Sequence, residues 1–287
     1  MDVKALKLND EGYPEVLRQL HQPPATLYYL GSRPAEWLAK PKVAIVGSRR
    51  ASGYGRAITT KLAEALARRG VVIISGLALG IDAEAHRAAL AGQGITVAVL
   101  PTSLDNIYPA SHFQLAQQII KSGGTLLSEY PSGAIPFKQN FIVRNRIVAG
   151  LADVLLITEA AVTSGTMHTA RFALEQGITV MAVPGNITSP GSEGCNNLIK
   201  SGAVPVTDVA DVCFALGIKD EPVEIADDPH ISRSEQRILQ LLKDGVVDQE
   251  QLALAAKLDA PSLSSALTML ELAGKIRPLG GGNWSLG

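Results

Sequence analysis

The sequence has too little cysteine for a disulfide framework. Only Cys195 and Cys213 occur among its 287 residues, and their spacing matches no zinc-binding pattern. It also has no basic start followed by an apolar segment, and no apolar run near the roughly 20 residues that span a bilayer. We therefore expect a cytoplasmic protein with two structural thiols, no metal site and no membrane contact.

An excess of positive charge is also missing. The net charge of −1 argues against a globally basic DNA binder. The charges are nevertheless segregated, because residues 37–63 contain no acid and several bases. These bases are Lys40, Lys42, Arg49, Arg50, Arg56 and Lys61. Such local positive charge in a neutral chain suits a defined anion groove, although scattered solvated cations fit the charge pattern equally well.

Short apolar runs alternate with helical patterns along most of the chain, which predicts a doubly wound α/β fold with a parallel sheet. The expected strands are 43–46, 71–74, 95–99, 125–127, 154–157 and 178–183. The expected helices are 55–69, 83–90, 112–122, 140–149 and 167–176. We assign residues 41–218 to this domain, and we expect residues 1–40 to be a lead-in that packs on it.

Residues 219–231 are acidic and contain proline, which is typical of a linker. Three helical patterns follow, at 234–243, 249–257 and 261–273, and then a hairpin pattern with three glycines. Residues 232–287 therefore indicate a small winged-helix domain.

The turns that follow the predicted strands are rich in glycine and hydroxyl side chains. Ligands of an open parallel sheet bind beyond the carboxyl ends of its strands, where helix N-termini offer free N–H groups to phosphate. Each glycine alone could simply permit a tight turn, but several such turns at one edge favour a phosphate site. The residues that they would contribute are Gly47, Ser48, Arg49, Arg50, Ser75, Gly76, Ser164, Gly165 and Thr166.

Two nucleotide motifs are incomplete or absent. Gly53-Tyr54-Gly55 lacks the third glycine of a dinucleotide fingerprint, and the second strand ends in Ser75 where an acid is needed. No phosphate-binding loop of the G-x-x-x-x-G-K-[ST] type occurs either. We therefore expect no cofactor.

Residues 137–146 interleave aromatic, basic and amide side chains before an apolar helix. Aromatic rings stack on bases of any sequence, while cations follow the phosphate backbone. The site residues that this segment predicts are Lys138, Phe141, Arg144, Asn145 and Arg146. The alternative is that Phe141 belongs to the core and the arginines are solvated.

Catalytic patterns are sparse. Asp82 and His86 lie four residues apart and could form an acid–base pair. A helix-capping role for Asp82, with His86 hydrogen-bonded locally, explains the pair more simply. We expect no enzymatic activity.

Taken together, these residues resemble the DNA-processing protein A (DprA/Smf) family over roughly residues 10–210. The segments that carry the resemblance are 47–49, 75–86, 127–131, 141–146, 164–170, 183–185 and 194–203. The resemblance implies an extended Rossmann-like domain that binds single-stranded DNA, forms homodimers and delivers the strand to the RecA recombinase in natural transformation. It also implies phosphate contacts from Ser48, Arg49, Lys138, Arg144 and Arg146, and weaker contacts from Asn196, Asn197 and Lys200.

Two rival functions remain open at this stage. Phosphoribohydrolases of nucleoside monophosphates share this Rossmann variant, and Glu129 or Glu159 would then act in catalysis. The winged helix could instead make the protein a regulator that binds duplex DNA. A groove-reading helix needs basic residues, however, and residues 261–273 contain neither lysine nor arginine.

Overall fold

The computed structural model describes residues 3–218 and 232–286 and divides the chain into two compact units, 1–221 and 222–287. The predicted acidic linker at 219–231 lies outside the described residues. Across the described ranges, no helix is both long and apolar enough to cross a membrane.

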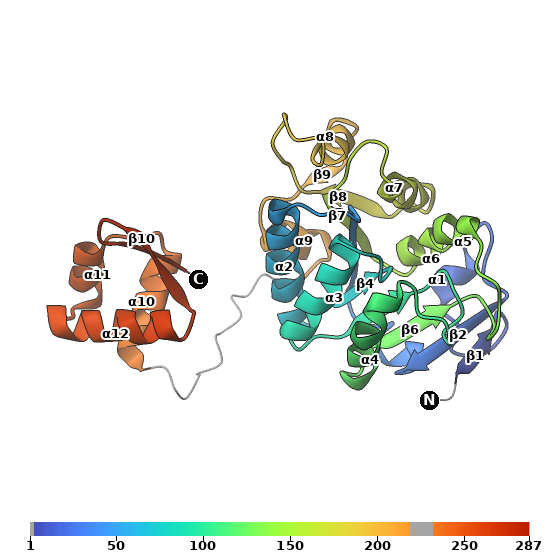
Figure 1. Cartoon of the computed structure of the whole chain (residues 1–287), viewed down its shortest axis with the longest axis horizontal. Coiled ribbons are helices and arrows are strands. Elements are labelled where there is room, and N and C mark those ends of the chain that lie inside the picture. Colours follow the sequence, from blue (N-terminus) through green and yellow to red (C-terminus); the bar gives the residue numbers. More distant parts are fainter. Residues whose placement is uncertain (1–2, 219–231, 287) are drawn as a thin grey trace. The chain divides into compact units, whose positions relative to one another are not determined.

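The first unit is built on a nine-stranded sheet with the order β1-β2-β6-β5-β4-β3-β7-β8-β9 (Figure 1). The strands from β3 to β9 pair in parallel. Their bounds are Lys42–Gly47 (β3), Val72–Ser75 (β4), Thr96–Val99 (β5), Thr125–Ser128 (β6), Val154–Glu159 (β7), Thr179–Ala182 (β8) and Val204–Pro205 (β9). The doubly wound α/β prediction is confirmed.

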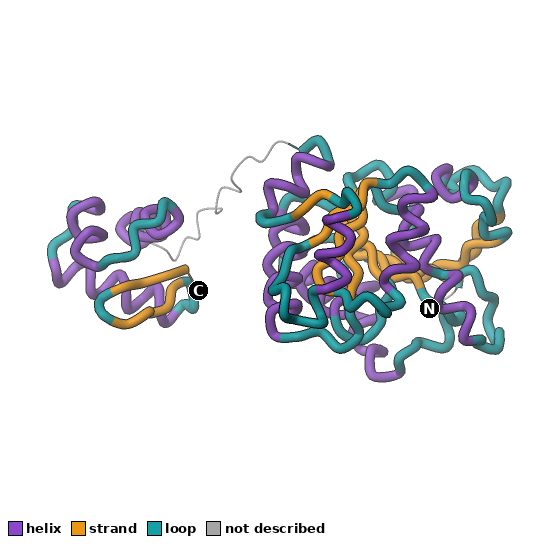
Figure 2. The backbone as a smooth tube through the Cα atoms, turned by 90° about the horizontal axis from the view of Figure 1, so that it is seen from above, coloured by secondary structure: helices purple, strands orange, loops and turns teal. Residues whose placement is uncertain are grey.

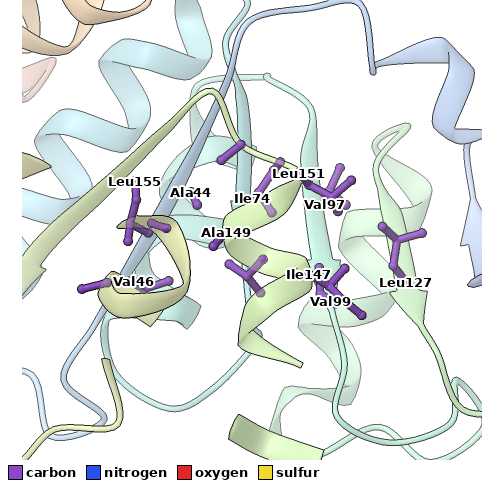
Figure 3. Close-up of a cluster of buried hydrophobic side chains, with 14 of the residues drawn as sticks. Ala44, Val46, Ile74, Val97, Val99, Leu127, Ile147, Ala149, Leu151 and Leu155 are labelled. Atoms are coloured by element: carbon purple, nitrogen blue, oxygen red, sulfur yellow. The ribbon is translucent and has the colours of Figure 1, made fainter. Parts of the chain in front are cut away.

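Helices cover both faces of this sheet (Figure 2). They are α1 (Glu15–Arg18), α2 (Gly53–Arg68), α3 (Ile81–Ala91), α4 (Phe113–Lys121), α5 (Lys138–Val143), α6 (Asn145–Gly150), α7 (Thr166–Glu175), α8 (Glu193–Lys200) and α9 (Val209–Ala215). Alternate residues of one strand enter opposite cores, since Ala44 packs with α6 and α7 whereas Val43 packs with α2 and α3. In Figure 3 the side chains of Ile147 and Ala149 from α6 join those of the strands in one cluster.

The lead-in is more than a segment packed on the domain, because it extends the sheet. Strands β1 (Lys4–Lys7) and β2 (Thr26–Gly31) are antiparallel, and β2 pairs with β6. Without β2, the backbone groups along that edge of β6 would have no partner strand. Trp37 is fully buried beside it and donates from its indole N–H to Thr125 Oγ1 at 3.0 Å.

The second unit consists of three helices and a hairpin around its own core. Its elements are α10 (Arg233–Lys243), α11 (Gln249–Ala256), α12 (Ala260–Leu272), β10 (Ile276–Gly280) and β11 (Asn283–Leu286). The order of these elements confirms the winged-helix prediction. Along α12 the exposed surface includes Met269 and Leu272, and the only charged residue of this helix is Glu271.

The strand order reverses between β3 and β7. From β3 the chain proceeds through β4, β5 and β6 on one side, and β7 to β9 continue on the other side. The turns that leave β3 and β7 therefore diverge, and they open a crevice at the carboxyl edge of the sheet. This topological switch point is where ligands of open α/β sheets bind.

Candidate functional site

A cavity of about 370 Å³ lies at the switch point. Turns after β3, β4 and β7 form its walls, together with residues of α5 and α6. We call it the switch-point pocket. The predicted site residues that line it are Gly47, Ser48, Arg49, Arg50, Gly76, Phe141, Arg144, Asn145, Ser164, Gly165 and Thr166. Segments more than 100 positions apart in the sequence thus meet in one place, as the sheet-edge argument predicts.

Arg49 and Arg50 give the pocket its accessible positive charge. Both residues are exposed, and neither pairs with a carboxylate among the residues that the structure describes. The guanidinium of Arg49 lies over the ring of Phe141, 5.6 Å from its centroid. Such a cation–π contact orients the guanidinium without neutralising it.

Gly47 lets this turn approach α3 closely. A Cβ added there would lie 2.6 Å from Ile81 Cγ1, so any larger residue would displace the arginine-bearing turn. Ser48 then fixes the turn, because its Oγ accepts from the N–H of Arg50 at 3.1 Å.

The turn before α7 contains the predicted residues Ser164, Gly165 and Thr166, and two of their backbone N–H groups are hydrogen-bonded within the turn. Ser164 N–H donates to the carbonyl of Ala161 at 3.0 Å, and Thr166 N–H donates to Ser164 Oγ at 3.2 Å. For the N–H of Gly165, no acceptor is present among the described residues. This N–H and the positive end of the helix dipole can both serve a phosphate oxygen.

Arg144 lies at the base of the pocket and is only 4% exposed. Its Nη1 donates to the carbonyl of Gly76 at 2.6 Å and also to that of Val99, so the guanidinium ties together the ends of β4 and β5. Burial lowers the pKa of Arg144 to about 10, with Asp82 opposing the shift, and the guanidinium therefore stays charged near neutral pH. Arg144 contributes a fixed charge beneath the accessible Arg49.

Asp82 is the carboxylate of the pocket lining. It accepts from the N–H groups of Gly76 and Ala78 at 3.1 and 3.4 Å. Burial raises its pKa, and the charge of Arg144 opposes this shift. The residue thus fixes the turn after β4 from the first turn of α3. The predicted capping role is wrong, because the N-cap of α3 is Gly80, although the carboxylate of Asp82 does lie near the positive end of the helix dipole.

The N-terminus of α2 is already occupied by a carboxylate of the protein itself. Glu159, at the end of β7, is 4% exposed and accepts from the N–H and Oγ of Ser52, the N-cap of α2. A Cβ added to Gly55 would lie 2.0 Å from Glu159 Oε2. This arrangement fills the place where a dinucleotide fold holds phosphate, in line with the incomplete glycine motif.

Six predicted site residues do not line the pocket. They are Ser75, Lys138, Arg146, Asn196, Asn197 and Lys200. Ser75 is fully buried and donates to the carbonyl of Ile45 at 2.6 Å, which leaves it no surface for a ligand. Asn196 instead closes the turn after β8, where its side chain bonds both the N–H and the carbonyl of Gly185.

Arg146 binds a carboxylate of the protein. Its Nη1 and Nη2 donate to Glu129 at 2.9 and 2.7 Å, and its Nε donates to the carbonyl of Gln22 in the lead-in. Both side chains of this ion pair are nearly buried, at 10% and 14% exposure. Arg146 therefore joins the lead-in to α6, which corrects its prediction as a phosphate contact.

The side chains named for the enzyme alternative are hydrogen-bonded to other residues of the protein. Glu129 is held by Arg146, and Glu159 by Ser52. His86 is fully buried outside the pocket, where its Nδ1 lies 2.7 Å from Thr96 Oγ1, and burial lowers its pKa to about 3. Among the described residues, no cluster of three potential metal ligands occurs.

Several residues that contribute to this region were not predicted from the sequence. Ala161, Thr163 and Thr169 line the pocket beside the Ser164 turn. Tyr108, after β5, contacts Phe141 with ring centroids 5.1 Å apart and an interplanar angle of 83°. Its position beyond the carboxyl end of a parallel strand was the available signal, but no glycine cluster marks that turn.

The fold and the pocket define a Rossmann-like α/β protein with a cationic pocket at its switch point. The family model described as "DNA recombination-mediator protein A" matches residues 4–217, and that of the "DprA winged helix domain" matches residues 222–282. The chain belongs to this family of DNA-processing recombination mediators.

Individual relatives agree with this assignment. Protein Smf of Escherichia coli (strain K12) is 40% identical over 282 residues, which are 96% of this chain and 75% of Smf. The X-ray structure of DNA processing protein A from Streptococcus pneumoniae is 40% identical, with a TM-score of 0.69. The match covers 74% of this chain and 73% of the S. pneumoniae chain. A structure of DNA processing protein A from Helicobacter pylori is 36% identical, with a TM-score of 0.67, and the match covers 75% of this chain and 95% of the H. pylori chain.

Proposed function

We propose that the chain binds single-stranded DNA without sequence preference in the switch-point pocket. The observation that carries this proposal is that one cavity combines two exposed arginines with one helix-terminal N–H, none of which has a carboxylate or acceptor partner in the part of the chain that the structure describes. A charged guanidinium and a backbone N–H recognise phosphate, which is the same in every nucleotide. The related H. pylori protein was described for its single-stranded DNA binding mode, which supports the same ligand.

A titration at several salt concentrations tests this function. We expect the logarithm of the binding constant for an oligo(dT) to fall linearly with the logarithm of salt, by about 0.7 for each phosphate contacted. We also expect single strands to bind more tightly than a duplex of equal length. Binding that does not depend on salt would contradict the proposal. So would equal affinities for the single strand and the duplex, if deletion of residues 232–287 abolished this binding.

As a recombination mediator, the chain would load the RecA recombinase onto incoming strands in natural transformation. A protein that makes no hydrogen bonds to the base edges leaves them free for pairing, so the strand can pass to a recombinase. The test is the lag before RecA hydrolyses ATP on protein-coated single strands. We expect the wild type to shorten this lag, and an unchanged lag would count against loading.

We also propose a homodimer through the Rossmann-like unit. Phe214 on α9 is 87% exposed, which is unusual for an aromatic side chain and provides an apolar contact. Light scattering coupled to size exclusion should give twice the chain mass of 30.2 kDa. Phe214→Glu should shift this mass toward the monomer, and a monomeric wild type would remove the proposal.

A further inference from the structure

A second, smaller recess adjoins the switch-point pocket. It shares Arg49, Gly76, Ala78, Phe141 and Arg144 with the pocket, so the two spaces meet at the arginines. The remaining wall is apolar or aromatic, with Leu79, Pro101, Tyr108 and Pro109. At about 50 Å³ the recess holds only a few water molecules, so a nucleobase could lie against its rim but not inside it.

Phe141, the aromatic residue predicted to face a base, is already engaged by the protein. Arg49 lies over its ring at 5.6 Å, and Tyr108 contacts it in a T-shaped arrangement. The side chain is also partly buried. Phe141 therefore supports two neighbours, the cation that would hold a phosphate and a second aromatic ring.

Tyr108 is the more accessible of the two rings. It is 51% exposed, and Leu79 across the recess is 50% exposed. Single exposed apolar side chains are ordinary on protein surfaces. Here, however, two of them border a cationic pocket and face the same recess, which gives a planar apolar ligand a surface beside a phosphate-binding group.

The loop that carries Tyr108 is held in place before any ligand arrives. Thr102 Oγ1 donates to the carbonyl of Asn106 at 2.6 Å, and the N–H of His112 donates to the carbonyl of Pro109 at 2.9 Å. The ring nitrogen Nδ1 of His112 lies 2.9 Å from the carbonyl of Leu77, which connects this loop to the turn after β4. A stacking ring on a fixed loop loses little conformational freedom on binding.

Resting on the proposed function, we propose that Tyr108 is a base-stacking residue of the single-stranded DNA site. The nucleotide whose phosphate meets Arg49 places its base on the exposed surface of the Tyr108 ring, against Leu79. Stacking of this kind accepts any of the four bases, because each has a π-face. Tyr108 therefore adds affinity to the phosphate contacts without adding sequence preference.

The test combines a protein change with a change in the ligand. Binding of oligo(dT) is compared with binding of an oligonucleotide of equal length and charge that consists of abasic sites. Tyr108→Ala and Tyr108→Leu should weaken oligo(dT) binding on the order of 5- to 100-fold. Neither variant should change binding of the abasic strand, which offers no base to stack, and Tyr108→Phe should retain affinity.

Phe113→Ala is the matched control, since Phe113 is 52% exposed and lines neither cavity. This variant should bind both ligands as the wild type does. Unchanged oligo(dT) binding by Tyr108→Ala and Tyr108→Leu would overturn the inference, as would an equal loss on both ligands. A wild type that binds neither ligand would instead refute the proposed function.

Discussion

Replacing Arg49 with alanine is expected to weaken binding of single-stranded DNA on the order of 10- to 100-fold, equally for every sequence. Arg49 is exposed, has no carboxylate partner among the described residues, and is oriented by Phe141 over the mouth of the pocket. Its replacement removes a charge-assisted hydrogen bond to phosphate and leaves no buried group unsatisfied. Fluorescence anisotropy with oligo(dT) and with a mixed sequence measures the effect.

The salt dependence provides a second readout of the same change. Loss of one phosphate contact should reduce the slope of the log–log salt plot by about 0.7. Arg68→Ala is the control, because it removes the same charge from a side chain on α2 that is 57% exposed and is paired with Glu64. Equal affinities for the wild type and Arg49→Ala would show that the strand binds elsewhere.

Arg146→Ala is expected to affect stability instead, by about 3–5 kcal/mol. The change leaves the nearly buried carboxylate of Glu129 without its bidentate partner, and it removes the hydrogen bond to Gln22 in the lead-in. Removing one partner of such a pair costs more than the pair itself contributes, because the remaining charge is uncompensated. Chemical denaturation followed by circular dichroism measures the loss.

An exposed ion pair provides the control for this loss of stability. Arg171→Ala breaks the exposed ion pair with Glu175 on α7 and should cost no more than about 1 kcal/mol. The folded fraction of Arg146→Ala should bind single-stranded DNA with nearly wild-type affinity. If Arg146→Ala instead had normal stability and a large loss of affinity, Arg146 would be a phosphate contact as the sequence predicts.

Most of the fold could be predicted from the sequence, because buried parallel strands are short apolar runs and helices have a different period. The lead-in could not be placed in the same way. Strand β2 pairs with β6, which lies about 100 positions further along the chain, and no local pattern specifies such pairing. Strand β9 has only two residues, too few for any period.

The site prediction brought the right residues together where topology alone determines their position. Turns after β3, β4 and β7 must reach the same edge of a parallel sheet, so their residues meet in the pocket. It failed within Arg144-Asn145-Arg146, where basic character was assigned to the whole segment. Successive helical residues point about 100° apart, so Arg144 faces the pocket while Arg146 faces Glu129.

The remaining misses have a similar cause. Ser75 belongs to a strand whose alternate side chains enter opposite faces, and its own side chain reaches Ile45. The hydrogen bonds of Glu159 to the N-cap of α2 could not be predicted from the sequence, since the two segments are separated by about 100 residues. Charge and residue type predict the chemistry of a site, but orientation decides which side chains take part.

The backbone N–H of Gly165 gives the most direct test of the site. Its amide signal in a nitrogen–proton correlation spectrum is followed during titration with oligo(dT). If the strand lies in the switch-point pocket, this signal and those of the 47–50 turn should shift in proportion to saturation, while the signals of α12 stay unchanged. Saturation with no shift at Gly165 or in that turn would contradict the central claim.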